Sequence, residues 1–200
     1  MCRLIETICV RDGQILHLSD HQDRMERSIF HLFGSHSPPL LEEYLEVPWE
    51  FKTGWVKCRV LYDQTIRDIT WNVYQIRSIS SIGLVYDDRV DYSWKFEDRS
   101  VFEQAIRAAR TDDVIMIRDG YLTDASYANI ILKSGSDWIT PSTPLLPGTQ
   151  RKRLLESRAI QAEPIRVRDL VHFEGIKYIN AMLDIERSPE MPMETIRHIQ

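Results

Sequence analysis

The chain has few cysteines, no long apolar run and no large excess of charge of one sign, and each absence excludes a class of protein. Its three cysteines, Cys2, Cys9 and Cys58, are odd in number and lack CxxC spacing. Neither a disulfide framework nor a metal site is therefore expected, and we interpret each cysteine as a small buried hydrophobe. No apolar run approaches the ~18 residues of a membrane span, and the N-terminus lacks the apolar core of a signal peptide. We expect a cytoplasmic protein without a membrane partner.

The charged residues are balanced and mixed along the sequence. There are 25 Lys and Arg against 30 Asp and Glu, which gives a formal net charge of -5. Because basic residues do not gather into blocks, we expect no nucleic-acid partner. At 200 residues, the chain can bury a substantial core, as one large domain or two small ones.

The first half of the sequence predicts a small α+β domain. Apolar residues alternate as in strands over residues 4–10, 55–62 and 66–76. A helix is expected from a capping box at Ser19 and Gln22 to a stop at Gly34. A second, short helix is expected at residues 40–45.

The second half predicts a larger domain of short strands and helices. Residues 80–93 are charged and weakly periodic, as in a linker, and a helix is expected from Asp98 to about Arg110. The other expected elements are strands over 114–118, 121–123, 129–133, 138–140, 164–167 and 176–180, a helix over 149–160 and a short helix that ends at Gly175. We place the domain boundary near residue 85, which gives domains of residues 1–85 and 86–200.

The most informative stretch of the sequence runs from Asp119 to Arg151. An Asp-Gly turn leads into a short apolar strand that ends in the carboxylate of Asp124, and a later strand is followed by the turn Pro147-Gly148 and a basic, helix-favouring segment. Backbone N–H groups at a helix N-terminus favour an anion, and a carboxylate can pair with a heterocyclic nitrogen. The pattern therefore suits a phosphorylated aromatic cofactor.

This stretch resembles the fold-type IV (class IV) pyridoxal-phosphate enzymes, which include branched-chain and D-amino-acid aminotransferases and 4-amino-4-deoxychorismate lyase. The resemblance extends from Glu6-Thr7 to Ala181-Met182. It implies pyridoxal 5'-phosphate as the cofactor and a two-domain α+β fold, with a small N-terminal α/β domain and a larger C-terminal mixed β domain with helices. It also implies a homodimer that acts on a small-molecule substrate.

Lys95 is the candidate for a Schiff base with the cofactor. It lies between Trp94 and Phe96, and an apolar setting lowers the pKa of a lysine, as a nucleophilic amine requires. From the local sequence alone, Lys95 could instead be a surface lysine whose stem lies on the aromatic rings. In the family that the chain resembles, the Schiff-base lysine precedes a helix and lies upstream of the pyridine-binding carboxylate, as Lys95 does here.

Asp124 is the expected partner of the pyridine nitrogen, at a position where the family more often has Glu. A carboxylate beside that nitrogen favours the protonated ring, which makes the cofactor an electron sink. Because Asp is one methylene shorter, it must approach the ring more closely or act through a water. The alternative is a turn or cap residue, which is a common use of Asp.

The resemblance also gives Arg24 a role. It matches the arginine of the family's His-x-x-Arg helix, and a guanidinium can donate two parallel hydrogen bonds to the cofactor phosphate. Arg24 could instead pair with Asp20 one turn earlier, and we interpret His21 as a helix-surface residue. Since Arg24 is not expected in the core, its removal should weaken cofactor binding and leave the fold intact.

The turn after the last predicted strand of this stretch completes the cofactor site that the resemblance implies. Gly148, Thr149 and Gln150 occupy the places of the family's phosphate-binding N–H groups and hydroxyl, and Gln150 replaces a frequent Thr. Leu146 is expected against the face of the ring, although a leucine before Pro-Gly is often a core residue. Asn180 lies where the family closes the pocket, and is otherwise a turn residue that ends a strand.

The substrate is expected to meet Arg59. In the family's aminotransferases a Tyr-x-Arg on the matching strand binds substrate carboxylates, and Lys57-Cys58-Arg59 stands in its place here. Arg59 is therefore a candidate carboxylate ligand, with a solvated strand face as the alternative. The replacement of the tyrosine by Lys57 argues against a branched-chain aminotransferase.

Two reactions fit these residues, and we favour a lyase. It would convert 4-amino-4-deoxychorismate to 4-aminobenzoate and pyruvate through the Lys95 Schiff base, without a 2-oxo acid acceptor. The chain is compact and lacks the tyrosine of the branched-chain pocket. The alternative is a class IV aminotransferase of the branched-chain or D-amino-acid type. A third interpretation is a cofactor-binding protein without turnover.

Overall fold

The computed structural model describes residues 2–197 and divides the chain into two compact units. The first unit runs to Ile76 and also contains the segment Trp94–Asp98, whereas the second contains Arg77–Ser93 and the rest of the chain. The boundary that the sequence places near residue 85 falls inside a strand of the second unit, β5 (Ile82–Tyr86). The division between the units therefore comes earlier in the chain than expected.

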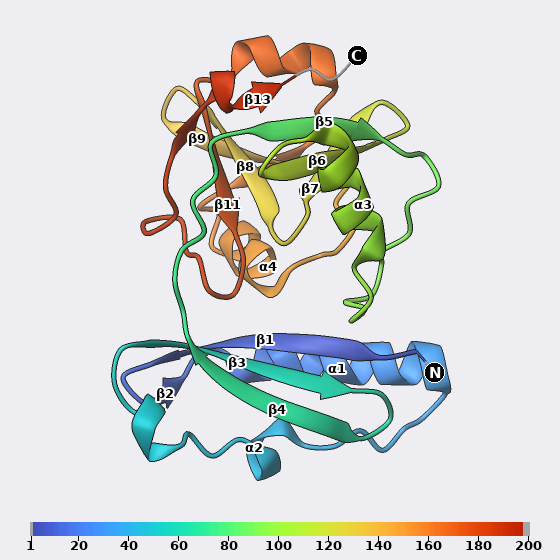
Figure 1. Cartoon of the computed structure of the whole chain (residues 1–200), viewed down its shortest axis with the longest axis vertical. Coiled ribbons are helices and arrows are strands. Elements are labelled where there is room, and N and C mark those ends of the chain that lie inside the picture. Colours follow the sequence, from blue (N-terminus) through green and yellow to red (C-terminus); the bar gives the residue numbers. More distant parts are fainter. Residues whose placement is uncertain (1, 198–200) are drawn as a thin grey trace. The chain divides into compact units, whose positions relative to one another are not determined.

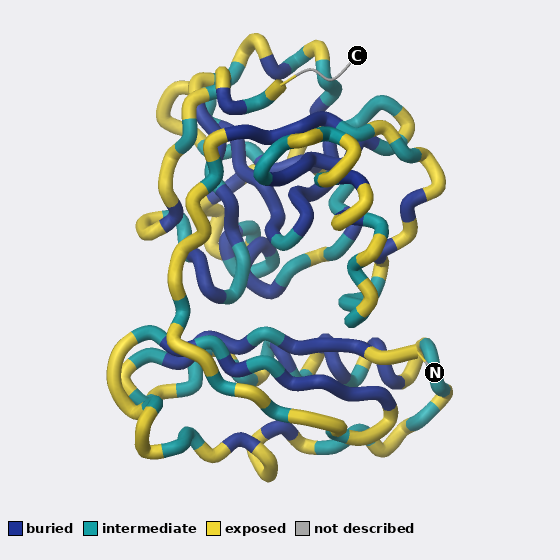
Figure 2. The backbone as a smooth tube through the Cα atoms, viewed as in Figure 1, coloured by how far each residue is buried: buried dark blue, intermediate teal, exposed yellow. Residues whose placement is uncertain are grey.

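An antiparallel sheet with a helix along one face forms the first unit (Figure 1). Its strands, in spatial order, are β2 (Gln14–Ile15), β1 (Leu4–Arg11), β3 (Trp55–Tyr62) and β4 (Ile66–Val73). β3 alternates as predicted, because Val56, Cys58 and Val60 are buried while Lys57 and Arg59 are only partly covered. The buried stretches of β1 and β3 stand out in Figure 2. This face of the sheet and the buried face of the helix make the core of the unit.

The long helix of the first unit, α1 (Leu18–Phe33), begins before the predicted capping box. Its N-cap is His17, in the left-handed conformation at φ 54°. The Gln22 side chain instead accepts the Leu41 N–H at 2.8 Å, so it fastens the start of α2 (Leu41–Tyr44). Gly34 ends α1 at φ 67°, as predicted.

The segment that carries Lys95 belongs to the sheet of the first unit. The Ile5 N–H donates to the Lys95 carbonyl at 2.9 Å, and the Glu97 N–H donates to the Arg3 carbonyl at 2.9 Å. Trp94 and Phe96 pack against the core of this unit. The backbone around Lys95 is therefore held along the edge of β1.

Two sheets form the second unit. One has the order β13 (Ile196–Arg197), β5, β6 (Asp113–Arg118) and β7 (Tyr121–Ala125), and α3 (Ser100–Ala109) packs against β5 and β6 (Figure 1). The other has the order β10 (Gln161–Glu163), β9 (Asp137–Pro141), β8 (Asn129–Ser134), β11 (Gly175–Ile179) and β12 (Met191–Pro192). The helix α4 (Thr149–Glu156) follows β9, and short 3-10 turns cover Trp49–Phe51 in the first unit and Val167–His172 and Met193–Thr195 in the second.

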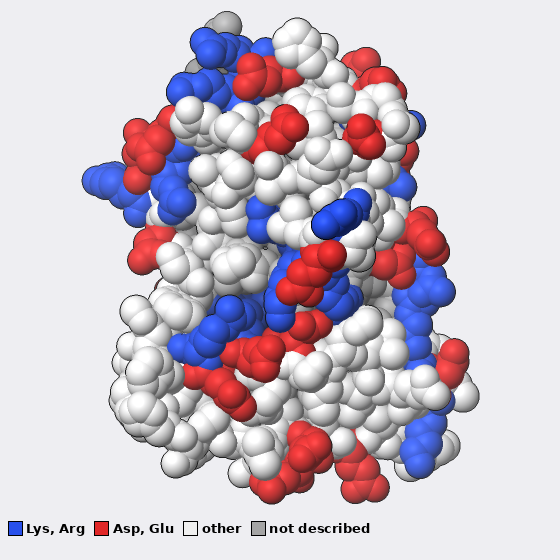
Figure 3. All heavy atoms as spheres, turned by 180° about the vertical axis from the view of Figure 1, so that it is seen from behind, with Lys and Arg blue, Asp and Glu red and all other residues white. Residues whose placement is uncertain are grey.

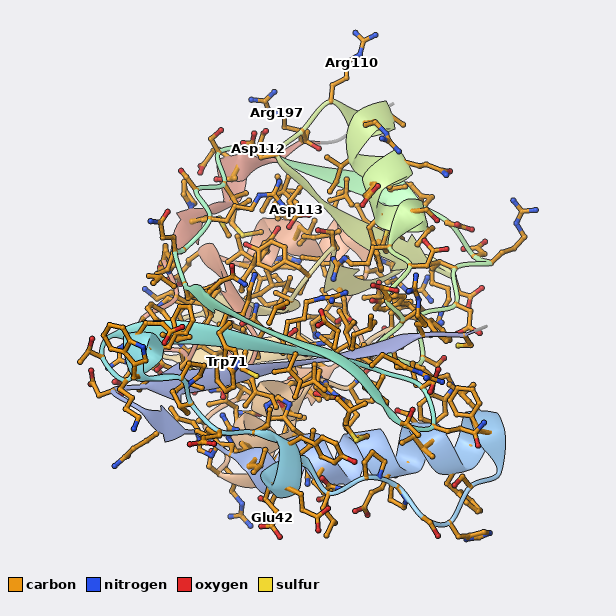
Figure 4. The ribbon with its side chains drawn as sticks, turned by 60° about the horizontal axis from the view of Figure 1, so that its bottom comes forward. Glu42, Trp71, Arg110, Asp112, Asp113 and Arg197 are labelled. Atoms are coloured by element: carbon orange, nitrogen blue, oxygen red, sulfur yellow. The ribbon has the colours of Figure 1, made fainter. Side chains whose placement is uncertain are left out.

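The prediction of a linker at residues 80–93 is wrong where the structure has the strand β5. Ile82, Gly83 and Leu84 are buried, and the strand pairs in parallel with both β6 and β13. A parallel strand covered on both faces has a continuous apolar run and lacks the alternation that marks an exposed strand. The start of β5 is joined to the start of β6, because the Asp112 carboxylate accepts hydrogen bonds from Ser80 and Ser81; Asp112 and its neighbour Asp113 are labelled in Figure 4.

Three smaller expectations also differ from the structure. The strand expected at 164–167 is replaced by β10, which ends at Glu163, and by the following 3-10 turn. The helix expected over 149–160 ends at Glu156. Cys9 and Cys58 are buried as expected, whereas Cys2 is exposed because it precedes β1.

The surface agrees with the mixed charge pattern of the sequence. On the face shown in Figure 3, acidic and basic side chains are intermingled. Within the described part of the chain, none of the helices is both long and apolar enough to span a membrane.

Candidate cofactor site

The carboxylate of Asp124 is buried at the end of β7, with 6% of the residue exposed. Its Oδ2 accepts the Leu146 N–H at 2.8 Å, and its Oδ1 accepts a hydrogen bond from Asn129 Nδ2 at 2.6 Å. Burial raises the pKa of Asp124 to about 6, although these two hydrogen bonds and the charge of Arg151 lower it. Both of these hydrogen-bond donors are neutral groups and bring no positive charge to the carboxylate. A cationic ring nitrogen beside Asp124 would supply that charge and favour the ionised form of the carboxyl.

The Asn129 amide links Asp124 to the turn before α4. Besides its bond to Asp124, Nδ2 donates to the Leu146 carbonyl at 2.9 Å. A Cβ on Gly148 would lie 2.2 Å from Asn129 Oδ1. Glycine is therefore required at position 148 because the asparagine side chain fills the space that any other residue would need.

Gly148→Ala should consequently destabilise the second unit by about 1–3 kcal/mol, the usual cost of overpacking. It should also weaken cofactor binding, because the displaced amide is the one that holds Asp124. Urea unfolding and a titration with pyridoxal phosphate measure the two effects. Gly175→Ala is the matched control, since its Cβ would contact the partly exposed Glu190 side chain at 3.0 Å or more, which is much less close than the 2.2 Å at position 148. Equal effects of the two substitutions would contradict this account.

The start of α4 offers a site for an anion. Gly148 is the N-cap, and Thr149, Gln150 and Arg151 are buried in the first turn. The first N–H groups of a helix have no partner within the helix, and the aligned peptide dipoles favour negative charge there. The Gln150 side chain is engaged along the helix, because its Oε1 accepts a hydrogen bond from Arg153. A phosphate at this turn would therefore be bound by backbone N–H groups, while the Gln150 side chain stays bonded to Arg153.

Leu146 and Asn180 lie in the same unit as Asp124. Leu146 is partly exposed while its neighbour Leu145 is buried, so Leu145 is the core residue of the pair and the Leu146 side chain is available to a ligand. The Asn180 Oδ1 accepts the N–H groups of Met182 and Leu183, at 2.8 and 3.0 Å. Asn180 thus serves as a turn residue, and any contact of its amide with the cofactor stays a prediction.

In the first unit, Arg24 belongs to a buried ionic cluster with Glu6 and His21. Arg24 Nε and Nη2 donate to the two Glu6 oxygens at 2.8 and 2.5 Å, and His21 Nδ1 lies 2.6 Å from Glu6 Oε2. Arg24 is 6% exposed, Glu6 0% and His21 1%. The expectations that Arg24 lies outside the core and that His21 is a surface residue are therefore wrong.

The charges of this cluster follow from its contacts. Burial alone would raise the pKa of Glu6, but the charge and hydrogen bonds of Arg24 bring it down to about 2. Burial lowers the pKa of His21, as do the positive charges of Arg24 and Lys95, whereas the hydrogen bond and the charge of Glu6 raise it. Glu6 is thus ionised and His21 neutral at neutral pH, and Lys95 lies within electrostatic reach of the cluster.

The predicted residues therefore fall into two sets, one in each unit. The first unit holds Arg24, Lys95 and Arg59, and Arg59 Nη2 donates to Glu97 Oε1 at 3.1 Å. The second unit holds the other set: Asp124, Leu146, Gly148, Thr149, Gln150 and Asn180. Within that set, Asn129 joins the Asp124 carboxylate to the turn at Gly148.

Comparison with known proteins places the chain in a family. The family model for amino-transferase class IV matches residues 97–187. A protein of Haemophilus influenzae, described only as uncharacterized, is 34% identical over 185 residues, which cover 91% of this chain and 98% of that protein. The chain belongs to the class IV aminotransferase family.

Solved structures of this class share the fold. A candidate 4-amino-4-deoxychorismate lyase from Haemophilus somnus is 33% identical and matches with a TM-score of 0.81, covering 92% of this chain and 98% of that one. A candidate amino-acid aminotransferase from Mesorhizobium loti, 17% identical, matches with a TM-score of 0.78 over the full length of both chains, which shows the fold alone. The two-unit α+β architecture is thus that of the fold-type IV enzymes.

Three residues of these clusters lie outside the site that the sequence predicts. Glu6 lies in an apolar strand, where nothing marks it as the partner of a helix arginine. Asn129 is predicted only as a strand residue, although an asparagine between apolar residues indicates a buried amide that needs hydrogen-bond partners. Arg151 is buried and donates to the Pro141 carbonyl at 2.9 Å, but in the run Gln150-Arg151-Lys152-Arg153 it looks like part of a solvated helix face.

Proposed function

We propose that the protein is a pyridoxal-phosphate-dependent 4-amino-4-deoxychorismate lyase that forms 4-aminobenzoate and pyruvate. The observation that carries the proposal is the buried Asp124 carboxylate, linked through Asn129 to a glycine turn at a helix N-terminus. These groups match the two ends of pyridoxal phosphate: a carboxylate for the ring nitrogen, and backbone donors for the phosphate. The likeness to the Haemophilus somnus protein supports the lyase within the class.

In this proposal the cofactor's electron-accepting ring supplies the chemistry, and the chain's own groups bind it and move protons. Asp124 holds the ring nitrogen in its protonated form. The N–H groups of Gly148, Thr149 and Gln150 would bind the phosphate, and Leu146 would pack on the ring. Arg24 is proposed as a phosphate ligand in addition to its two bonds to Glu6. The Lys95 amine would hold the cofactor, and as a free amine it would take the proton from the ring carbon that bears the substrate's amino group. The C–O bond to the enolpyruvyl group breaks as the ring becomes aromatic, and the departing enol takes up a proton to give pyruvate.

The decisive experiment asks whether the purified protein needs a 2-oxo acid. We expect it to release pyruvate from aminodeoxychorismate with pyridoxal phosphate alone, measured by coupling to lactate dehydrogenase, and expect Lys95→Ala to abolish the release. An absolute requirement for a 2-oxo acid, with transfer of the amino group, would identify an aminotransferase. Binding without either activity would identify a cofactor-binding protein.

The attachment of the cofactor can be tested without turnover. Borohydride reduction of the protein loaded with pyridoxal phosphate, followed by peptide mass mapping, should place a pyridoxyl group on Lys95. An adduct on Lys133 or Lys177 with unmodified Lys95 would exclude this assignment.

We also propose a cytoplasmic homodimer, because active sites of the family lie near a subunit interface. Sedimentation at micromolar concentration tests the dimer.

The proposed role of Arg59 as a ligand for a substrate carboxylate faces a competitor. Glu97 takes one hydrogen bond from Arg59 and another from Arg3, at 3.1 and 2.7 Å, so a substrate carboxylate would compete with Glu97 for the Arg59 charge. Glu97→Gln should therefore lower KM by about threefold to fivefold, since partly exposed ion pairs contribute up to about 1 kcal/mol. Arg59→Met should raise KM with little change in kcat, the pattern of lost uniform binding. A higher KM in Glu97→Gln would indicate that the pair only fastens the Lys95 segment.

A further inference from the structure

The second unit holds Asp124 by neutral hydrogen-bond donors on both carboxylate oxygens. The Asn129 amide and the Leu146 N–H each contact one oxygen, at 2.6 and 2.8 Å. Each oxygen of a carboxylate can accept two hydrogen bonds, so even with a further interaction from the Leu145 backbone the Asp124 carboxylate can accept another donor. The orientation of the carboxylate is set by Asn129 and Leu146, because a short aspartate side chain cannot reorient without breaking both bonds.

Of the two donors, only Asn129 is a side chain. Its orientation is fixed by two hydrogen bonds of its Nδ2 and by the close approach of its Oδ1 to Gly148. Its Nδ2 donates to Asp124 Oδ1 and to the Leu146 carbonyl at 2.9 Å, which uses both hydrogens of the amide. Its Oδ1 faces Gly148, where a Cβ would lie 2.2 Å away. Turning the amide over would bring its oxygen against two acceptors, so a single orientation is stable. Asn129 itself is 6% exposed.

The neutrality of Asn129 has a consequence for the charge of the site. A lysine or arginine in contact with Asp124 would neutralise the carboxylate and reduce its attraction for a second cation. An amide fixes the carboxylate without adding a charge, so the carboxylate keeps its attraction for a cation in direct contact, although the Arg151 charge also acts on it. The arrangement suits a partner that brings its own positive charge.

We propose that Asn129 is a positioning residue that directs the Asp124 carboxylate toward a protonated ring nitrogen and ties it to the turn at Gly148. The inference rests on the proposed binding of pyridoxal phosphate. It assigns recognition of the ring nitrogen to an amide that does not itself contact the cofactor. It also explains how the shorter aspartate serves where the family usually has glutamate: the carboxylate is held by donors of the neighbouring strand and turn.

The test compares two ligands of the apoprotein, pyridoxal phosphate and its 1-deaza analogue, in which a C–H replaces the ring nitrogen. Wild type should bind pyridoxal phosphate more tightly than the analogue. Asn129→Ala should reduce this ratio of affinities by about threefold to tenfold, the usual net contribution of one hydrogen bond, and should change affinity for the analogue much less. Thr143→Val is the control, because it removes a hydrogen bond to the Leu122 carbonyl in the same unit and should leave the ratio unchanged.

The variant Asn129→Leu keeps the test decisive if the alanine variant does not fold. It retains most of the volume of the side chain and removes the donor without adding a charge, so the ratio of affinities should again fall. A wild-type ratio retained in either folded variant would overturn the role of Asn129. A wild type that does not distinguish the two ligands would instead overturn the proposed role of Asp124, so the two failures are distinguishable.

Discussion

Replacing Arg24 by alanine should destabilise the first unit by about 3–5 kcal/mol, the cost of leaving one partner of a buried ion pair without the other. Glu6 is fully buried and takes two hydrogen bonds from the guanidinium, at 2.8 and 2.5 Å. The neighbouring His21 should replace only part of the lost charge, since burial lowers its pKa even though the loss of the Arg24 charge would raise it. Thermal or urea unfolding of the apoprotein measures the loss. A cofactor titration of Arg24→Ala alone would therefore report a damaged fold as well as a lost phosphate ligand.

The double variant Glu6→Leu/Arg24→Met is the control for this effect. Replacing both members of a buried ion pair by apolar residues of similar volume is often neutral for stability, so the double variant should recover most of the loss. If it folds but binds pyridoxal phosphate weakly, the role of Arg24 as a phosphate ligand is supported independently of stability. If Arg24→Ala lowers the free energy of unfolding by less than about 1 kcal/mol, the ionic cluster contributes little to folding.

The same cluster determines how the first unit responds to acid. The pKa of Glu6 is about 2 in the fold against 4.5 for the model carboxyl, so its contribution is complete above pH 4.5 and is lost as the pH falls toward 2. The folded pKa of His21 is also lowered, from 6.5. Its contribution is likewise lost as the pH falls, beginning near 6.5, because the unfolded state takes up the proton more readily. Both groups therefore make the first unit less stable in acid.

Local patterns were sufficient for much of the fold. The alternation in β3, the stop of α1 at Gly34 and the short strands around Asp124 follow from residue spacing, and the structure shows them. β5 was hidden because a strand buried on both faces has no alternation, and its charged neighbours resemble a linker. Ser19 is not the cap, because α1 begins one residue earlier, at Leu18, with His17 as its N-cap.

The parts of the candidate site that could not be predicted depend on contacts between distant elements. Glu6 and Arg24 lie on a strand and a helix, and each looks like an ordinary charged residue of its own element. Their pairing becomes visible only when α1 lies on the sheet. Asn129 and Gly148 are a similar case. Glycine is required before α4 because the Asn129 side chain, on the strand β8, occupies the space beside it. The resemblance to the family points to Arg24, Asp124 and Gly148. Their partners, Glu6 and Asn129, are brought to them only by the packing of the fold.

In the apoprotein, Asp124 should make the second unit less stable as the pH rises. Its pKa is raised from 3.8 to about 6 in the fold, so between these values the folded state holds a proton that the unfolded state has released. The stability contributed by the neutral carboxyl is complete below pH 3.8 and is lost as the pH rises to about 6. Asp124→Asn should remove this dependence, which unfolding at several pH values would show. A bound ring cation should oppose the loss.

Asp124→Asn should separate cofactor retention from turnover. The variant keeps the phosphate-binding turn and Lys95, so its affinity for pyridoxal phosphate should fall by about tenfold at most. Its turnover should fall at least about a hundredfold, the scale on which loss of one preorganised electrostatic contact acts, because a neutral amide does not hold the ring nitrogen protonated. Asp124→Glu restores the charge and should keep more activity than Asp124→Asn, even though the ring must shift. Since Leu146 and Asn129 both donate to position 124, an asparagine there also leaves one donor without an acceptor. Equal turnover in Asp124→Asn and wild type would mean that Asp124 is only a turn residue.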